Sequence, residues 1–376
     1  MKGTIEIKGE LSLLQKILHL NWGLVLLITA LACVGFVALY SAAGGRLEPW
    51  AHQQMIRFGV FLVMMIVIAL IDIRIWHRFA YWLYALGFLL LIVVEAMGHI
   101  GMGAQRWISI GPLQIQPSEL MKIVVIMALA RYFHARAADD TLRLGSLILP
   151  ALMIAAPVGL VMLQPDLGTA AMIALGGAAL LFMAGAPLWI FVSGVVAVGA
   201  SLPVAWHFLH DYQKQRVLTF FDPERDPLGA GYHIMQSKIA LGSGGVSGKG
   251  FLQGSQSHLN FLPEKQTDFI FTLWAEEWGL LGGVALLSLF GLVFIYGWWI
   301  SFRCRHLFGR LLAFGLMMNF ALYVFINIAM VMGLIPVVGA PLPLISYGGT
   351  AMMAAMIGFG LMMSCSLHRD VKMMRF

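Results

Sequence analysis

The sequence predicts an all-α integral membrane protein with about ten transmembrane helices and one large extracytoplasmic loop between the seventh and eighth spans. Apolar residues make up 60% of the 376 positions and charged residues only 11%, whereas soluble proteins average about 25% charged residues. The mean hydropathy is +0.86. A chain with so few charged side chains does not cover a water-facing surface, so a soluble fold is excluded.

The expected spans are apolar stretches close to the length of about 20 residues that a membrane helix needs. They cover 22–41, 53–72, 79–97, 117–134, 146–163, 169–184, 187–207, 269–301, 310–335 and 350–367. Only short turns separate the fifth, sixth and seventh stretches, so the count there could change by one. The eighth stretch is long enough to tilt or to begin above the membrane.

The arrangement of these spans predicts a single polytopic domain over 1–376. It divides into a cytoplasmic N-terminus at 1–21, seven spans within 22–207, the extracytoplasmic loop at 208–268, three spans within 269–367 and a cytoplasmic C-terminus at 368–376. Lys and Arg in short loops stay cytoplasmic. Most of them fall on the side of the two termini, and the opposite short connections hold only Arg46, Arg57 and Arg106.

Several classes of protein are excluded by smaller features. The pI near 9.3 follows mostly from the cytoplasmic Lys and Arg, so it does not indicate nucleic-acid binding. Cys33, Cys304 and Cys365 show no pair spacing, which argues against a disulfide framework or a zinc site. The apolar run from Trp22 is longer than the core of a cleaved signal peptide.

An ionisable residue inside a span must have a structural or functional role, because its insertion into the membrane costs about 2.5–3.5 kcal/mol on insertion scales. Glu119 and Lys122 lie three residues apart on one expected helix and can pair. They form either a salt bridge at the start of a helix or the lining of a cavity that opens outward. Asp166, in the turn after 146–163, is either a turn residue or part of the same cavity. Of the neighbours Glu276 and Glu277, at least one should face the bundle interior.

The stretch 334–349 cannot be a continuous helix, because it holds Pro336, Pro341, Pro343 and the pair Gly348-Gly349. Irregular backbone at membrane depth is tolerated only when protein buries it or when it lines a wet cavity. We therefore expect a re-entrant or capping segment on the outer face.

The loop 208–268 carries the candidate chemistry. Its glycine segment 242–250 is flexible, and main-chain N–H groups there could form an anion-binding nest; it lacks the pattern of a phosphate-loop ATPase. Several cations of the outer face are either ordinary surface charge or anion contacts: Arg106, Arg216, Lys238, Lys249 and Lys265. Asp268, at the mouth of the eighth span, is either an N-cap or a catalytic carboxylate at the lipid boundary.

A series of motifs resembles the SEDS family (shape, elongation, division and sporulation) of cell-wall glycan polymerases, from about Trp22 to His368. The motifs lie at 103–108, 116–119, 164–169, 221–224, 226–232, 236–240, 242–245, 261–264, 267–271 and 341–349. The stretch 337–343 is more similar to the elongation members than to the division members. One departure is Gln266, where the family usually has His.

The resemblance implies a peptidoglycan glycosyltransferase of the bacterial inner membrane that polymerises lipid II into β-1,4 glycan for elongation and rod shape. The reaction would be an inverting displacement with undecaprenyl diphosphate as the leaving group. Asp268 matches the catalytic position, as general base or as ligand of a divalent metal ion, Mg²⁺ or Mn²⁺. Substrate and diphosphate contacts would come from Arg106, Trp107, Lys122, Arg216, Lys238 and Lys249. Supporting residues of the cavity would be Glu119, Asp166, Gln236, Ser346 and Tyr347.

The implied partners are a class B penicillin-binding transpeptidase, other membrane proteins of the elongation complex, lipid II and the nascent glycan, and no nucleic acid. Two alternatives remain open at this point: a flippase that moves lipid II, and a non-catalytic scaffold of the elongation complex. A flippase needs polar groups along a path through the bilayer. Here the polar residues cluster toward the outer face, which favours the enzyme.

Overall fold

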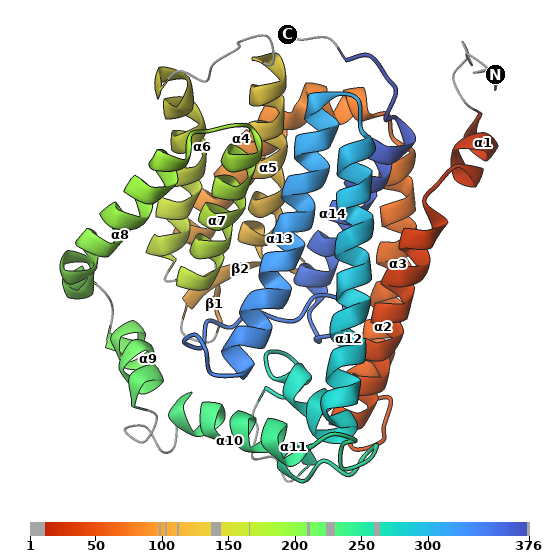
Figure 1. Cartoon of the computed structure of the whole chain (residues 1–376), viewed down its shortest axis with the longest axis vertical. Helices are drawn as coiled ribbons and strands as arrows, with labels where there is room; N and C mark the ends of the chain where they lie inside the picture. The colour runs from red at the N-terminus through yellow and green to blue at the C-terminus, as the bar shows by residue number, and fades with distance from the viewer. Residues whose placement is uncertain are drawn as a thin grey trace.

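The chain is seen in a computed structural model that describes most of its length. The described residues are 12–97, 99–101, 104–110, 113–136, 144–164, 166–208, 211–222, 230–258 and 264–373. Long helices run side by side along the longest axis of the molecule, and both termini lie at the same end (Figure 1). The expectation of an all-helical membrane protein is confirmed.

The helices follow the apolar stretches of the sequence. They are α1 Leu13–Leu18, α2 Trp22–Ala42, α3 Ala51–Leu70, α4 Ile73–Met97, α5 Pro117–Ala135, α6 Leu144–Leu163, α7 Leu167–Met183, α8 Leu188–Phe208, α9 Asp211–Phe221, α10 Ala230–Ser243, α11 Ser255–His258, α12 Ile270–Arg303, α13 Leu307–Val331 and α14 Gly349–Leu367. Among the described residues, seven helices are long and apolar enough to cross a membrane: α2, α3, α4, α6, α12, α13 and α14.

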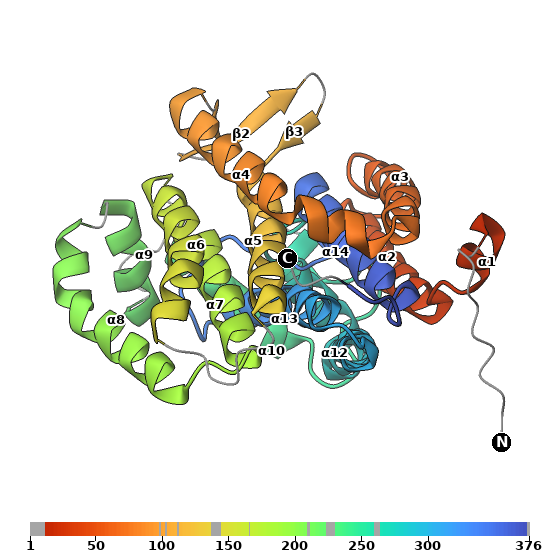
Figure 2. The same cartoon turned by 90° about the horizontal axis from the view of Figure 1, so that it is seen from above.

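Helix α5 lies in the middle of the bundle, where it packs against α4, α6, α7, α13 and α14 (Figure 2). Pro117 lies in its first turn, where a missing N–H has no cost. Side chains on every face of this helix are buried, including those of Glu119 and Lys122. A helix that is covered all round is typical of a protein interior, so α5 carries the ionisable pair Glu119 and Lys122 into the core.

A small antiparallel sheet joins α4 to α5, and sequence analysis did not predict it. Its strands are β1 His99–Gly101, β2 Ala104–Ile110 and β3 Leu113–Ile115, in the order β1-β2-β3. In the register of β2 with β3, Ile108 pairs with Ile115 and Ile110 with Leu113. β-branched residues favour strands, and the short apolar alternation in this connection was the available signal.

Helix α12 is interrupted at Gly279, whose backbone is not helical (φ 64°, ψ −160°). The glycine segment 242–250 packs into this break. The amides of Lys249 and Gly250 donate to the carbonyls of Glu276 and Glu277 at 3.1 and 3.0 Å. A Cβ on Gly248 would lie 2.0 Å from the Glu277 carbonyl oxygen, so only glycine fits there. The prediction of a flexible anion-binding nest was wrong for these amides, because backbone carbonyls of α12 accept their hydrogen bonds.

The segment 334–348 between α13 and α14 is non-helical, as the sequence predicted, and several residues of its second half are buried. Its side chains at Ala340, Leu342 and Leu344 are each 1% exposed. A Cβ on Gly35 of α2 would lie 2.7 Å from the Leu344 carbonyl oxygen, so the segment runs directly against α2. Protein contacts thus replace the water that irregular backbone would otherwise need.

Candidate functional site

Asp268 lies in the turn that leads into α12 and is partly exposed. The N-cap position of α12 is occupied by Phe269, without a side-chain cap. The interpretation of Asp268 as an N-cap is therefore wrong, and its carboxylate is directed elsewhere. A Cβ built on Gly339 would lie 3.5 Å from Asp268 Oδ2, which places the carboxylate beside the segment 334–348.

Three hydrogen bonds hold the backbone that carries this carboxylate. Tyr347 N donates to the Gln266 carbonyl at 2.8 Å, and Ser346 Oγ donates to the Thr267 carbonyl at 2.5 Å. Asn327 Nδ2 donates to the Asp268 carbonyl at 2.9 Å. We call Asn327, Ser346 and Tyr347 the carboxylate clamp. Because consecutive carbonyls are bound, the clamp restricts both the position and the rotation of the Asp268 backbone.

The clamp is itself anchored to two other parts of the bundle. Asn327 Nδ2 also donates to the Ala340 carbonyl at 2.7 Å, and Ser346 Oγ accepts from Leu342 N at 2.8 Å. From α3, Gln54 Nε2 donates to the Ser346 carbonyl at 2.8 Å. These bonds connect the Asp268 turn with α3, α13 and the segment 334–348.

Arg57, a cation of α3, lies beside Tyr347 of the carboxylate clamp. The Arg57 guanidinium carbon lies 4.8 Å from the centroid of the Tyr347 ring, and Tyr347 OH donates to Gln53 Oε1 at 2.5 Å. Sequence reasoning did not select Arg57, Gln53, Gln54 or Asn327 as site residues. The sequence did contain a signal for these residues, since each is a polar side chain inside a stretch expected to span the membrane.

A second polar group lies in the core between α5 and α13. Lys122 Nζ pairs with Glu119 Oε1 at 2.8 Å, and these side chains are 1% and 7% exposed. Tyr323 OH donates to both carboxylate oxygens of Glu119 at 2.5 Å and also contacts Lys122 Nζ. The predicted pairing of Glu119 with Lys122 is confirmed, and Tyr323 completes a buried triad that sequence analysis missed.

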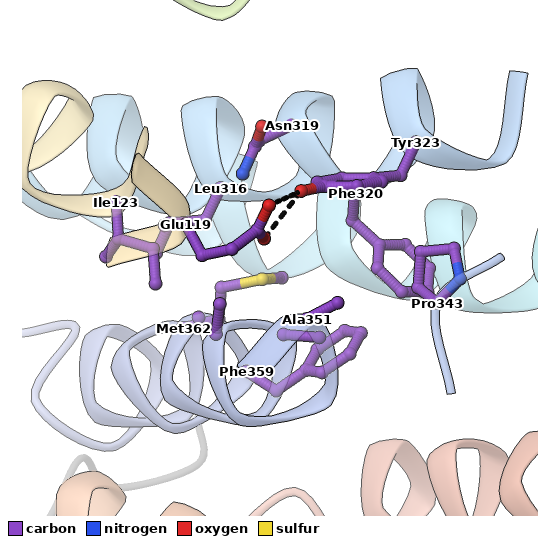
Figure 3. Close-up of a pocket in the computed structure, with 13 residues that line it drawn as sticks. Glu119, Ile123, Leu316, Asn319, Phe320, Tyr323, Pro343, Ala351, Phe359 and Met362 are labelled. Atoms are coloured by element: carbon purple, nitrogen blue, oxygen red, sulfur yellow. Dashed lines mark hydrogen bonds between the residues drawn. The ribbon is translucent and has the colours of Figure 1, made fainter. Parts of the chain in front are cut away.

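Glu119 and Tyr323 of this triad border a small cavity, which Figure 3 shows with the Glu119 carboxylate directed at the Tyr323 hydroxyl. The cavity measures about 30 Å³ and is lined also by Asn319, Pro343 and residues of α14. A water needs about 10–15 Å³ of such volume, so there is room for two waters. Pro343 belongs to the segment 334–348, which therefore lines this cavity as well as supporting Asp268.

Asp166 has the role of a turn residue. It is the N-cap of α7, where it accepts from Thr169 N at 3.1 Å and from Thr169 Oγ1 at 3.0 Å. It also accepts from Gln116 Nε2, ahead of α5, at 3.3 Å. These bonds confirm the turn interpretation of Asp166, which is not among the described residues that line the small cavity.

Lys249 is engaged by a buried carboxylate. Its Nζ lies 2.8 Å from Glu276 Oε1 and 2.7 Å from Ser255 Oγ. The Glu276 side chain is 0% exposed, and its neighbour Glu277 is buried against Ser41 of α2. Both acids face the interior with different partners, as the sequence predicted for at least one of them. Because the Lys249 ammonium neutralises Glu276, it is not free to contact a diphosphate.

The remaining candidates are less closely grouped. Lys238 of α10 is exposed, and a Cβ on Gly333 would lie 2.8 Å from its Nζ, which places the ammonium at the start of the segment 334–348. Gln236 has a buried Oε1 without a hydrogen-bond partner among the described residues. Trp107 is half-buried on β2. The side chains of Arg106 and Arg216 lie outside the described part of the chain.

No group of three or more His, Cys, Asp or Glu side chains in the described ranges is arranged to hold a metal ion. Mg²⁺ is commonly bound by one or two carboxylates together with substrate phosphates and water. Asp268 offers a single carboxylate, so it fits a Mg²⁺ site only when oxygens of the substrate supply further ligands.

Comparison with known proteins identifies the family. Residues 19–371 match the family of cell cycle proteins that contains FtsW, RodA and SpoVE. The chain is 46% identical over 357 residues to the peptidoglycan glycosyltransferase MrdB of Escherichia coli K12, covering 94% of this chain and 95% of that protein.

Solved structures agree. A chain of a peptidoglycan synthase complex, described as coordinating polymerization and crosslinking, superposes with a TM-score of 0.83 at 34% identity and covers 94% of this chain and 100% of its own length. The rod shape determining protein RodA of Thermus thermophilus superposes with a TM-score of 0.73 at 30% identity, covering 94% and 99%. The chain therefore belongs to the FtsW, RodA and SpoVE family of cell cycle proteins.

Proposed function

We propose that this protein is a peptidoglycan glycosyltransferase that polymerises lipid II into β-1,4 glycan strands for cell-wall elongation and rod shape. The class of reaction is supported by the MrdB relative, which is named for it. The observation that carries the proposal is the carboxylate clamp. A partly exposed acid, held through consecutive backbone carbonyls at the start of a membrane helix, is suited to a substrate whose lipid tail stays in the bilayer.

The reaction is an inverting displacement. An acceptor hydroxyl oxygen bonds to the anomeric carbon of the donor sugar while the bond from that carbon to the diphosphate oxygen breaks. The electron pair of the broken bond leaves with undecaprenyl diphosphate, and the α-linkage becomes β. Asp268 accepts the proton of the acceptor hydroxyl as general base, a role that requires a carboxylate within hydrogen-bond reach of that hydroxyl.

Cations assist the leaving group as negative charge develops on it. Lys238 and Arg57 suit direct contact with the diphosphate, because no ion pair engages either of them within the described part of the chain. Arg106, Trp107 and Arg216 are proposed to contribute from the outer connections. Lys122 and Lys249 act one step further away, since carboxylates already neutralise them.

Mg²⁺ or Mn²⁺ is proposed as an accessory to the diphosphate. Asp268 is the protein ligand that the site offers, and diphosphate oxygens and water would supply the others. The ion would neutralise charge on the leaving group. Gln236 and the triad of Glu119, Lys122 and Tyr323 are proposed to support the protein around the site rather than to contact the reactants.

We infer that the bundle has ten spans, with α5, α7 and α8 crossing the membrane in addition to the seven apolar helices. Both termini then face the cytoplasm, and the segment 208–268, with α9, α10 and α11, faces outward as part of one polytopic domain. Support comes from the termini lying at one end of the bundle and α10 and α11 at the other (Figure 1). The Lys and Arg of the short connections gather at the same end as the termini.

The proposed partners are a class B penicillin-binding transpeptidase and other membrane proteins of the elongation complex, with lipid II and the nascent glycan as ligands and no nucleic acid. Support comes from the synthase-complex chain, whose assembly is described as coordinating polymerization with crosslinking. Glycan made at Asp268 would then be passed to a crosslinking enzyme on the outer side.

The test is polymerisation of labelled lipid II by the purified protein with its transpeptidase partner, followed by separation of glycan products by size. Asp268→Ala and Asp268→Asn should abolish product while the protein elutes as a folded species. Asp72→Asn is the matched control, since Asp72 caps a distant turn by accepting from Arg74 N at 2.8 Å. Wild-type rates from Asp268→Ala would refute the assigned base. Labelled lipid II crossing sealed vesicles without any polymerisation would refute the enzyme in favour of a transporter.

A further inference from the structure

A larger cavity lies at the end of the bundle opposite Asp268. It measures about 460 Å³, and its lining includes Arg305, His306, Arg310, Asp370 and Lys372. The cavity is bounded by the start of α13, the end of α5 and the tail that follows α14. Arg310 is separated from Val331, at the other end of α13, by roughly 30 Å of helix. This cavity is therefore independent of the proposed polymerisation site.

The described lining carries more positive than negative charge. Arg305, Arg310 and Lys372 are cations, and Asp370 is the acid among the lining residues. Asp370 is already engaged, with Oδ1 3.0 Å from Arg305 Nε and Oδ2 3.4 Å from Arg369 Nε. Within the described ranges neither Arg310 nor Lys372 has an acidic partner. Two unpaired cations thus face one hollow.

Arg310 points to a missing acceptor. Its Nε is buried and has no hydrogen-bond partner among the described residues. Leaving a buried donor without an acceptor is unfavourable, and more so when the donor belongs to a charged group. A bound anion in the cavity would satisfy this donor and neutralise the charge together.

The N-terminal end of α13, beside Arg310, has the polarity that favours a bound anion. The first turn of α13 presents backbone N–H groups and the positive end of the helix dipole. His306, the N-cap, accepts from Gly309 N through Nδ1 at 2.9 Å, so the other ring nitrogen carries the proton and faces the His368 carbonyl at 3.3 Å. Burial lowers the pKa of His306 to about 4. The histidine is thus neutral near pH 7, and the charge in the cavity comes from Arg310 and Lys372.

We infer that this cavity binds a phosphate group, carried either by an anionic lipid headgroup or by a soluble phosphate. Its unpaired cations suit a tetrahedral anion, and Arg is well matched to phosphate oxygens. The exposed Trp298 and Trp299 of α12 lie near the same end, and Trp side chains mark the level of lipid headgroups. Basic pockets between helices at this level bind phosphate headgroups.

The experiment measures binding to the full-length protein purified in an uncharged detergent. One arm titrates inorganic phosphate, and the other titrates phosphatidylglycerol in mixed micelles with phosphatidylcholine as the neutral reference. Affinity is obtained by isothermal titration, and a rise of the unfolding midpoint with ligand concentration gives a second readout. The variants are Arg310→Gln and Lys372→Gln. Arg303→Gln is the matched control, because Arg303 stacks over Trp299 at 4.0 Å and does not line the cavity.

Each lining variant should weaken binding roughly tenfold or more, as expected for loss of one charge-assisted contact, and Arg303→Gln should bind as the wild type does. Lys372 is exposed on the tail, so its variant tests the site without a risk to folding. Binding of phosphatidylglycerol alone assigns the site to a lipid, and binding of inorganic phosphate assigns it to a soluble anion. The inference is overturned when wild type binds neither ligand, or when both lining variants bind as tightly as Arg303→Gln.

Discussion

Replacing Ser346 by Ala tests whether the carboxylate clamp positions Asp268. The substitution removes one oxygen and leaves two buried backbone groups without it, the Thr267 carbonyl and the Leu342 amide. Ser346 is only 3% exposed, so water does not readily replace the hydroxyl. Each unsatisfied group costs about 1–3 kcal/mol, which puts the local loss at about 2–6 kcal/mol.

The effect on catalysis arises because the substitution releases the Thr267 carbonyl. With the Thr267 carbonyl free, the turn that carries Asp268 loses one of its three hydrogen bonds to the clamp. If about 1.4–2.8 kcal/mol of this loss appears in the transition state, polymerisation slows roughly tenfold to a hundredfold. The assay is the initial rate of glycan formation at saturating lipid II, which reports kcat separately from KM.

Ser364 provides the matched control on the same helix system. Its hydroxyl also donates to a backbone carbonyl, that of Ile71, at 2.8 Å, and the residue is 0% exposed. It lies roughly 20 Å further along α14 from Gly349. Ser364→Ala leaves one carbonyl without its donor, so it should destabilise the protein by about 1–3 kcal/mol and leave kcat unchanged. Equal rates for the two variants at a temperature where both are folded would refute the positioning role of Ser346.

Three further outcomes are expected. Gly248→Ala should lower the unfolding temperature and the yield of folded protein, because its Cβ would lie 2.0 Å from the Glu277 carbonyl oxygen. Tyr323→Phe should reduce polymerisation and stability together, because Glu119 loses a hydrogen bond at 2.5 Å from a buried hydroxyl. For His306, burial lowers the pKa in the folded state from 6.5 to about 4. Between these pH values the unfolded chain therefore binds more protons than the folded protein does. The free energy of unfolding should fall by about 3 kcal/mol as the pH drops from 6.5 to 4.

Each of these outcomes has a direct check. A Gly248→Ala protein that melts at the wild-type temperature would contradict the close packing of the glycine segment on α12. Tyr323→Phe with full activity would show that the hydroxyl is dispensable for the triad. Thermal melts of wild type and His306→Gln between pH 4 and 7 test the titration, since the variant should show a smaller decline toward acid pH.

Much of the architecture is predictable because the rule for a membrane helix is local. The expected span 117–134 became α5 Pro117–Ala135, and 350–367 became α14 Gly349–Leu367. Prolines correctly indicated the non-helical segment 334–348. The expected start at 79 was late, since α4 begins at Ile73, and charged residues at its N-terminal end were taken for a loop although a helix end tolerates them.

Other features depend on contacts that no local pattern records. The break of α12 at Gly279 exists because the segment 242–250 supplies alternative hydrogen bonds to its carbonyls. Asn327 was not selected from the sequence, and its amide lies between the carbonyls of Asp268 and Ala340. For Lys249 the sequence left surface charge and anion contact open, and its partner Glu276 lies on another element.

The sequence by itself determined that this protein is a multi-pass membrane protein of helices, because apolar length and charge distribution act one segment at a time. It also marked Asp268, Glu119 and Lys122 as residues in need of an explanation. Only the tertiary structure decided which polar groups meet. Ser346 and Thr267 are separated by 79 positions in the chain, and their contact arises because helix packing brings the segment 334–348 against the start of α12.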